Sequence, residues 1–334
     1  MSKKHTLDNF FTSSPKRPRV AEVSAKPAAD PPTQTDLPTS NHPTYPYPVQ
    51  HFPQFIANAL SDVPAVEGKE INNQPDLDLL YFQPYIPKSI ERYLFEFLRQ
   101  ELFFYRVQYK IKRGPVETQI NTPRYTTVFG VDESSRFTID GSLIDAQTCK
   151  PIPSDRYRTC KPRPIPHCLD ELRKITEIFT SSAYNFCLVN YYATGADSIS
   201  YHSDDERFLG TEPAIASISL GAKRDFLLKH KPVPPSAKEP RPVLEDEKPL
   251  KLPLASGDMI LMKGRTQANW LHSIPKRKGG ESDKGRINIT FRKAMMKGGT
   301  ENYYQYNVGN GGVWRWDSQK REMRPWVDTS GVAV

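Results

Sequence analysis

The segment RINITFR, residues 286–292, constrains the fold of this chain more than any other stretch. Side chains of an extended strand alternate between two faces. One face of this strand carries Ile287, Ile289 and Phe291. The other face carries Arg286, Asn288, Thr290 and Arg292. Two arginines on an inner face are costly to bury unless an anion lies between them. The row therefore favours a strand that lines a polar cavity, and a half-exposed strand is the alternative.

A dicarboxylate would satisfy both arginines, because the guanidinium fork binds a carboxylate through two parallel hydrogen bonds. A second strand, NFCLVNYY over residues 185–192, has a similar mixed face. Its alternation puts Asn190 and Tyr192 on the same face as Phe186 and Leu188. The two strands together predict a small polar ligand inside a β structure.

Further β-rich runs follow residue 184, namely AIASISL, DFLLKH and GDMILMK, separated by Gly, Pro and charged loops. Short strands without intervening helices predict an antiparallel barrel or sandwich. Helical spacing of apolar residues precedes them in residues 88–104, where Ser89 is a plausible N-cap, and in residues 167–179. The fold class is therefore mainly β with flanking helices.

Composition divides the chain into unequal parts. The 31 prolines and the hydrophobic content of 37% indicate that part of the chain does not fold, and residues 1–70 are the expected disordered tail. We expect an extension over residues 71–183, a β domain over residues 184–295 and a C-terminal extension over residues 296–334. The last of these is aromatic and basic, so it packs on the core or contacts nucleic acid.

Charge and cysteine content indicate the surroundings of the protein. The net charge of +8 fits a polyanionic partner such as nucleic acid, and the four cysteines form no CxxC pair, as is typical of a reducing compartment. No apolar run approaches the roughly 20 residues that a membrane span needs. We expect a monomer without membrane attachment.

The stretch YHSDDE, residues 201–206, contains a His and an Asp two positions apart. His202 and Asp204 can point the same way from an extended segment, and His272 follows a strand far downstream. Two histidines and one carboxylate with open positions form the site of non-haem Fe(II) oxygenases. A solvated acidic turn is the alternative for this stretch alone, but the combination with His272 and the arginines favours a metal site.

Four segments carry a resemblance to a known family: NYYATGADSISYHSDDE, ASISLGAKRDF, WLHSIP and RINITFR. They are similar to the signature segments of AlkB-type Fe(II)/2-oxoglutarate dioxygenases, with the nuclear DNA-repair branch the most similar. The resemblance implies a double-stranded β-helix, or jelly roll, preceded by a nucleotide-recognition lid. It also implies oxidative demethylation of N-alkylated DNA bases such as 1-methyladenine and 3-methylcytosine. Such a reaction uses Fe(II), O2 and 2-oxoglutarate and releases succinate, CO2 and formaldehyde.

The resemblance also assigns roles to the residues of the two polar strands and of YHSDDE. It implies that Fe(II) is bound by His202, Asp204 and His272. Arg286 would pair with the distal carboxylate of 2-oxoglutarate and Arg292 with the carboxylate next to the keto group. The cosubstrate pocket would be completed by Asn190, Tyr192 and Asn288, which agrees with the alternation of the two strands.

Substrate contacts are predicted on both sides of the metal site. Asp205 would contact the exocyclic amine of the damaged base, with Glu206 beside it, and a solvated acid that caps a turn is the alternative for Asp205. The basic segment of residues 105–124, which ends at Arg124, suits a hairpin pressed on phosphates. Candidate rings for enclosing the base are Tyr125, Phe129 and Phe137, and core packing is the alternative for each.

The first residues resemble two short motifs. KKHTLDNFF is similar to a PCNA-interacting box over residues 4–11, in which Leu7, Phe10 and Phe11 would fill the pocket of the clamp. Lys4 stands where the usual glutamine would be. SPKRPR, residues 14–19, is typical of a nuclear import signal or of a solubilising patch, so the nucleus is the expected location.

Two other functions compete with DNA demethylation. An RNA base demethylase would have the same fold and the same site, because other AlkB relatives act on RNA. A non-catalytic, clamp-tethered binding protein would not need the complete metal and cosubstrate sets. The nuclear tail and the clamp-like box favour DNA.

Overall fold

A computed structural model of the chain describes residues 37–113, 116–153, 155–158, 160–232, 248–309 and 311–327. The predicted clamp box with Leu7, Phe10 and Phe11, and the basic segment of residues 14–19, lie outside these residues. In the part of the chain that is described, no helix is long and apolar enough to cross a membrane.

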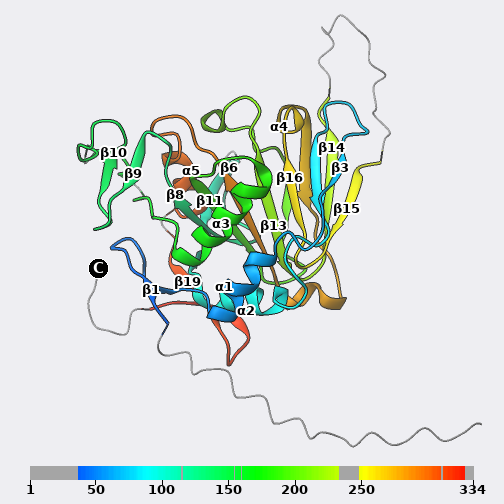
Figure 1. Cartoon of the computed structure of the whole chain (residues 1–334), viewed down its shortest axis with the longest axis horizontal. Helices are drawn as coiled ribbons and strands as arrows, with labels where there is room; N and C mark the ends of the chain where they lie inside the picture. The colour runs from blue at the N-terminus through cyan, green and yellow to red at the C-terminus, as the bar shows by residue number, and fades with distance from the viewer. Residues whose placement is uncertain are drawn as a thin grey trace, which may run out of the picture. The chain divides into compact units, whose positions relative to one another are not determined.

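Eight strands of the chain divide between two antiparallel sheets (Figure 1). One sheet contains, side by side, β11 (Phe186–Tyr192), β18 (Arg286–Arg292), β13 (Ile215–Gly221) and β16 (Met259–Met262). The other contains β12 (Ile199–His202), β17 (Trp270–Ile274), β14 (Arg224–His230) and β15 (Leu250–Leu254). The chain crosses from sheet to sheet as it runs from β11 to β18, which is a double-stranded β-helix, or jelly roll. Five of its eight strands, namely β11, β13, β14, β16 and β18, are those predicted from the β-rich runs.

The larger sheet continues on both sides of the jelly roll, to ten strands in all. Beyond β16 lie β4 (Leu79–Phe82) and β3 (Lys69–Ile71). Beyond β11 lie β8 (Tyr125–Gly130), β5 (Phe104–Tyr105), β19 (Val313–Asp317) and β20 (Glu322–Pro325). Residues before 184 and after 295 therefore contribute strands to the same sheet as the jelly roll.

Both predicted long helices form. In α2 (Glu91–Glu101) the expected apolar stripe is buried at Leu94 and Leu98, but the helix is capped by Ile90 without a side-chain hydrogen bond, not by Ser89. In α3 (His167–Thr180) Leu169 and Leu172 are buried. Figure 1 shows α3 lying across the sheet near β8 and β11, with α1 (Gln54–Ala59) and α2 below it.

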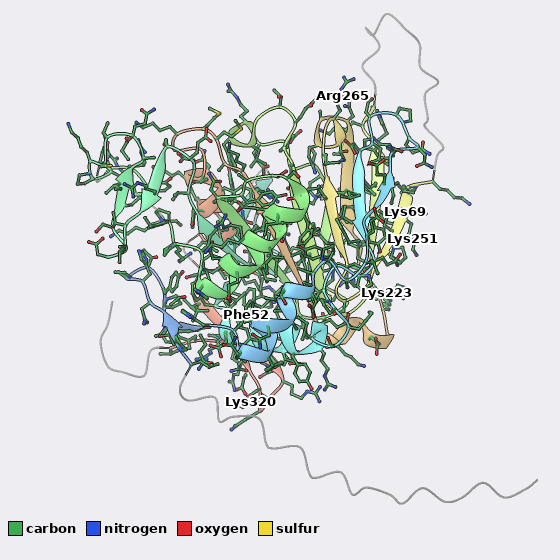
Figure 2. All side chains as sticks on the ribbon, viewed as in Figure 1. Phe52, Lys69, Lys223, Lys251, Arg265 and Lys320 are labelled. Atoms are coloured by element: carbon green, nitrogen blue, oxygen red, sulfur yellow. The ribbon has the colours of Figure 1, made fainter. Side chains whose placement is uncertain are left out.

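The expectation of a disordered tail through residue 70 is wrong for residues 37–70. This segment contains β1 (Thr39–Ser40), β2 (Val49–Gln50), α1 and the 3₁₀ helix η1 (Leu60–Asp62). Phe52 is buried with its ring centroid 5.1 Å from that of Phe97 on α2, and Figure 2 places Phe52 beside these helices. Prolines and the missing periodicity hid this order, because it comes from aromatic side chains that pack on the body of the protein.

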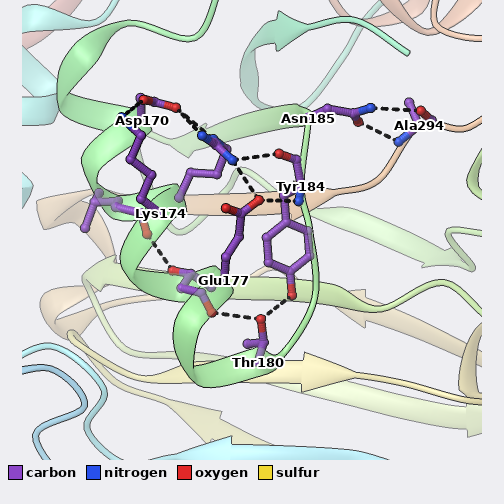
Figure 3. Close-up of polar contacts among 10 residues, drawn as sticks. Asp170, Lys174, Glu177, Thr180, Tyr184, Asn185 and Ala294 are labelled. Atoms are coloured by element: carbon purple, nitrogen blue, oxygen red, sulfur yellow. Dashed lines mark hydrogen bonds and ion pairs between the residues drawn. The ribbon is translucent and has the colours of Figure 1, made fainter. Parts of the chain in front are cut away.

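Polar contacts tie α3 to the residues just before β11, and tie those residues to the chain just after β18 (Figure 3). Arg173 donates hydrogen bonds to Asp170, to Glu177 and to the Tyr184 carbonyl oxygen. The Asn185 amide donates to the Ala294 carbonyl oxygen at 3.0 Å, and its oxygen accepts from the Ala294 N–H at 2.7 Å. These contacts fix the register of β11 beside β18, and so align the two polar strands of the sequence.

Smaller elements complete the described chain. A separate hairpin of β6 (Gln108–Arg113) and β7 (Val116–Asn121) forms within the basic segment where a hairpin was predicted. Its role as a nucleotide-recognition lid stays a prediction. The remaining elements are β9 (Ser135–Phe137), β10 (Leu143–Asp145), η2 (Arg207–Leu209), α4 (Thr266–Asn269), η3 (Gly280–Lys284) and α5 (Glu301–Asn307). Of these, η2 and α5 contribute residues to the site.

Candidate active site

Strands β12 and β17 set two histidines opposite each other, because their antiparallel register pairs His202 with His272. Asp204 follows just beyond the end of β12. His272 Nε2 lies 3.7 Å from Asp204 Oδ2, and His202 Nε2 lies 4.0 Å from Asp204 Oδ1. One ligand atom from each residue lies within 4.8 Å of the others, so the three side chains can hold one metal ion. The structure thus brings together the three residues predicted as ligands.

Backbone contacts orient these ligands. His202 Nδ1 lies 2.9 Å from the Ser200 carbonyl oxygen, an arrangement that puts the proton on Nδ1 and leaves Nε2 open for a metal. The Asp204 N–H donates to the Gln267 side-chain oxygen at 2.9 Å. Because Gln267 is itself buried, this hydrogen bond fixes the backbone of the turn that carries Asp204.

Electrostatics keep Asp204 and His272 in the protonation states that a metal requires. Burial alone would raise the pKa of Asp204, but the Arg292 guanidinium at 2.9 Å and the two histidines bring it below its usual value. Burial lowers the pKa of His272 to about 3. An ionised carboxylate beside a neutral imidazole is the form in which these side chains bind Fe(II). The residues therefore fit the metal.

The inner face of β18 presents two buried arginines to the same cavity. Arg286 is 1% exposed and Arg292 is 2% exposed. The Nε and Nη1 groups of both have no hydrogen-bond partner among the residues that the structure describes, although Arg286 Nη2 donates to Ser219 Oγ at 2.7 Å. Burial lowers the pKa of Arg286 to about 10, still far above neutral pH. Burial opposes the charge of Arg292 too, but the Asp204 carboxylate raises its pKa above the usual value, so both arginines are cationic. Buried cationic donors without acceptors indicate an anion site.

The cavity has a volume of about 670 Å3 and contains both the metal triad and the arginine pair. Asn190, Tyr192 and Asn288, which the sequence assigned to the cosubstrate pocket, also line it. The Tyr192 ring lies with its centroid 5.3 Å from the Arg286 guanidinium carbon. A cavity with a metal triad and two open guanidinium groups fits 2-oxoglutarate, whose two carboxylates supply the missing acceptors.

The predicted substrate residues separate into two groups. Arg124 and Glu206 line the cavity. Arg124 Nε donates to Asn190 Oδ1 at 2.9 Å, and Glu206 Oε2 lies 3.7 Å from Arg292 Nη1. Asp205 does not belong to the lining: its side chain is 55% exposed and its Oδ2 lies 2.9 Å from Lys231 Nζ. Of the two acids, Glu206 is therefore the one that faces the site.

The three rings predicted to enclose the base lie elsewhere. Phe129 is fully buried in the core, with its ring centroid 5.5 Å from that of Phe103. Tyr125 is buried against Trp314, and the Phe137 ring packs on His42. Phe129 has no exposed surface with which to contact a base, and none of the three rings lines the cavity. Core packing, the alternative, accounts for Phe129 and Tyr125.

Sequence reasoning missed a wall of the cavity that comes from residues 296–307. The lining residues from this segment are Met296, Gly299, Asn302, Tyr303, Tyr306 and Asn307. The run NYYQY was visible as an aromatic cluster in the C-terminal extension. Nothing in its spacing placed it beside the metal, because that position depends on how α5 docks on the sheet.

Comparison with known proteins agrees with this geometry. The profile of the 2OG-Fe(II) oxygenase superfamily matches residues 78–292. "DNA oxidative demethylase ALKBH2" of Homo sapiens is 37% identical over 138 residues, which are 41% of this chain and 50% of that protein. "Alpha-ketoglutarate-dependent dioxygenase alkB homolog 3" of Mus musculus is 40% identical over 139 residues, which are 41% of this chain and 46% of that protein. ALKBH2 of Arabidopsis thaliana is 28% identical over 259 residues, which are 71% of this chain and 76% of that protein.

The chain thus spans about half the length of the first two relatives that it matches. The family profile covers the whole jelly roll, both polar strands and all three metal ligands. Fe(II) and 2-oxoglutarate, which the triad and the arginine pair fit, are the cofactors of this family. The chain therefore belongs to the 2OG-Fe(II) oxygenase superfamily and is an AlkB homologue.

Proposed function

We propose that this protein oxidatively demethylates N-alkylated bases in DNA, of the 1-methyladenine and 3-methylcytosine type. The observation that carries the proposal is one cavity that contains both a buried His-Asp-His triad and two buried arginines with open donors. Fe(II), O2 and 2-oxoglutarate supply oxidation of a C–H bond when bound, with succinate and CO2 as products. The oxidised N-methyl carbon then leaves the base as formaldehyde.

The chain's own residues bind, orient and shield the reactants. Arg286 would hold the distal carboxylate of 2-oxoglutarate, and Arg292 the carboxylate nearer the metal, while it also neutralises Asp204. The burial of both guanidinium groups excludes water, which strengthens these charge-assisted hydrogen bonds. Glu206 would face the cationic ring of an alkylated base from the wall of the cavity.

The substrate has to leave a helical stack to reach the metal. His272 and Asp204 are buried, so a target base must be single-stranded or flipped out of a duplex. Support for nucleic acid comes from the net charge of +8 and from the basic residues Arg124 and Arg207 on the lining of the cavity. DNA is favoured over RNA by the relatives named DNA oxidative demethylase.

The proposal also includes recruitment of the protein to DNA by its N-terminal segment. Residues 4–11 would bind a PCNA-type clamp and residues 14–19 would direct the protein to the nucleus, where it would act as a monomer. Clamp binding would raise the local concentration of the catalytic domain at newly made DNA.

The test is turnover on defined substrates. Purified protein with Fe(II), 2-oxoglutarate and O2 is incubated with oligonucleotides that carry one 1-methyladenine, as single- and double-stranded DNA and as RNA. We expect formaldehyde and succinate in equal amounts with DNA, and neither above background with Asp204→Ala. Formaldehyde from RNA alone would make the protein an RNA demethylase. Oligonucleotide binding without product from any substrate would favour a binding protein.

A further inference from the structure

The wall of the cavity formed by α5 lies outside the residues that match the family. The superfamily profile ends at residue 292, whereas α5 spans residues 301–307. Four residues of this short helix line the cavity, namely Asn302, Tyr303, Tyr306 and Asn307. Residues three or four apart in a helix lie on one face, so α5 turns a single face to the site. This face has no counterpart in the metal and cosubstrate sets already described.

Hydrogen bonds to the body of the protein fix α5 in place. The buried Tyr304 hydroxyl donates to the Gly130 carbonyl oxygen at 2.8 Å and accepts from the Arg163 N–H at 3.0 Å. The Thr126 hydroxyl donates to the Asn307 carbonyl oxygen. Gly130 and Thr126 belong to β8, a strand of the larger sheet. These hydrogen bonds fix the orientation of α5 relative to β8, and so the face that it turns to the cavity.

Two tyrosines on this face are in opposite situations. Tyr303 is buried: its ring packs on Phe186 and Phe208, and it lies 5.3 Å from the Arg292 guanidinium carbon. Tyr306, one turn further, is 75% exposed. It makes no ring contact or hydrogen bond with the part of the chain that the structure describes. Among the described aromatic residues on the lining, Tyr306 alone keeps most of its ring open.

Neighbouring groups indicate what the open ring would meet. Asn302, one turn before Tyr306, is exposed on the lining, and its amide makes no hydrogen bond with the described residues. Arg207 is an exposed cation on the same lining. A flat ring, an amide and a cation match the three parts of a nucleotide: the face of the base, the edge of the base and the phosphate.

We propose that the Tyr306 ring stacks on the target base at the entrance of the cavity, with the Asn302 amide beside the edge of the base. Tyr306 is then a binding residue that takes over the role that the sequence had assigned to Tyr125, Phe129 and Phe137. The proposal rests on the proposed function, because it takes the substrate to be a nucleic-acid base. To the proposed function it adds the identity of the residue that stacks on the base.

The test compares three variants with the parent protein. Tyr306→Ala removes the ring, Tyr306→Phe keeps the ring without the hydroxyl, and Tyr93→Ala removes a tyrosine that is 57% exposed on α2, away from the cavity. KM and kcat for a single-stranded oligonucleotide with one 1-methyladenine are measured. So are succinate formation without an oligonucleotide and the Kd of the oligonucleotide by fluorescence anisotropy. Melting temperatures verify that each variant is folded.

Tyr306→Ala should raise KM and Kd by about tenfold, as loss of one stacked ring does, with a smaller effect on kcat. Tyr306→Phe and Tyr93→Ala should behave like the parent. Unchanged KM and Kd in Tyr306→Ala would overturn the stacking, and so would an equal loss in Tyr306→Phe, which would assign the effect to the hydroxyl.

The binding arm separates this inference from the proposed function. If the parent makes no formaldehyde but binds the oligonucleotide, demethylation fails as the function, and the Kd of Tyr306→Ala against that of Tyr306→Phe still decides the stacking. If the parent turns over and Tyr306→Ala equals it, the stacking alone fails. If the parent neither turns over nor binds the oligonucleotide, both proposals are overturned.

Discussion

The guanidinium group of Arg292 lies 2.9 Å from the carboxylate of Asp204, with both side chains almost fully buried. One arginine therefore serves two sites, because its Nη2 neutralises a metal ligand while its Nε and Nη1 make no hydrogen bond with the described residues and line the same cavity. Asp204 keeps a lowered pKa through this contact. The metal site and the anion site are coupled by a single side chain.

The metal triad gives the first prediction. His202→Ala, Asp204→Ala and His272→Ala should each abolish demethylation, because each removes one of three metal ligands. The fold should persist, since the jelly roll does not depend on these side chains for its core. Formaldehyde release and a circular dichroism spectrum check this, and appreciable turnover by any folded variant would refute the ligand assignment.

Arg286 gives the second prediction, which concerns cosubstrate affinity. Arg286→Ala should raise the KM for 2-oxoglutarate by about ten- to a hundredfold, because a hydrogen bond to a charged group contributes roughly 1.5–3 kcal/mol. The KM of Arg286→Lys should lie between those of the parent and of Arg286→Ala, since lysine keeps the positive charge but lacks the guanidinium fork. This KM is measured from the rate of succinate formation at increasing concentrations of 2-oxoglutarate. A normal KM in the alanine variant would mean that the open donors of Arg286 do not bind the cosubstrate.

The two neighbouring acids give the third prediction. Glu206 lines the cavity, whereas Asp205 is paired with Lys231 outside it. Glu206→Gln should therefore lower kcat/KM for cationic 1-methyladenine more than for a neutral etheno adduct, by on the order of tenfold. Asp205→Ala is the matched control variant, and it should change kcat/KM little and to the same extent for both lesions. A selective loss in Asp205→Ala would instead restore the role that the sequence suggested for it.

The clamp box gives the fourth prediction. Replacing Phe10 and Phe11 by Ala should remove binding to PCNA, because two aromatic side chains would fill the pocket of the clamp. Activity on a short oligonucleotide should stay unchanged, since recruitment adds nothing when no clamp is present. Peptides of residues 1–20 with either sequence can be compared by calorimetry. Equal affinities of the two peptides would end the clamp hypothesis.

The fifth prediction concerns pH and stability. Burial raises the pKa of Glu101, the last residue of α2, above its ordinary value of 4.5. Folding therefore favours the neutral acid, so this stability is present below pH 4.5 and is lost as pH rises through the folded-state pKa. Glu101→Gln should raise the melting temperature at pH 7.5 by a few degrees at most, and the gain should vanish near pH 4.5. Glu96→Gln, on the exposed side of α2, should show no such gain.

The metal and cosubstrate sites could be predicted from sequence because they depend on local geometry. Alternation along β11 and β18 places Asn190 and Arg286 on inner faces whatever the rest of the chain does. The spacing of His202 and Asp204 likewise sets two ligands on one side of an extended segment. Only His272 needed the fold to bring it near, and its pairing with His202 across β12 and β17 does so.

The substrate wall could not be predicted in the same way. An aromatic residue suits both a core and a stacking site, so the sequence could not tell Phe129, which is fully buried, from Tyr306, which is open. The order of residues 37–70 could not be predicted from the sequence for a related reason. Their order comes from Tyr47 and Phe52, which pack on Phe103 and Phe97, and no local pattern reveals such contacts.

The ten-stranded sheet imposes an order on folding during synthesis. Strand β5 pairs on one side with β8, through Tyr105 and Thr126, and on the other with β19, through Phe104 and Trp314. The first pair can form soon after it is made, but the second must wait until most of the chain has left the ribosome. Distant strand pairs form slowly, because the loop between them has to close first. Until β19 has been made, the edge of β5 that will pair with it is exposed and can pair with other chains. We therefore expect the nascent protein to depend on chaperones until residue 317 has emerged.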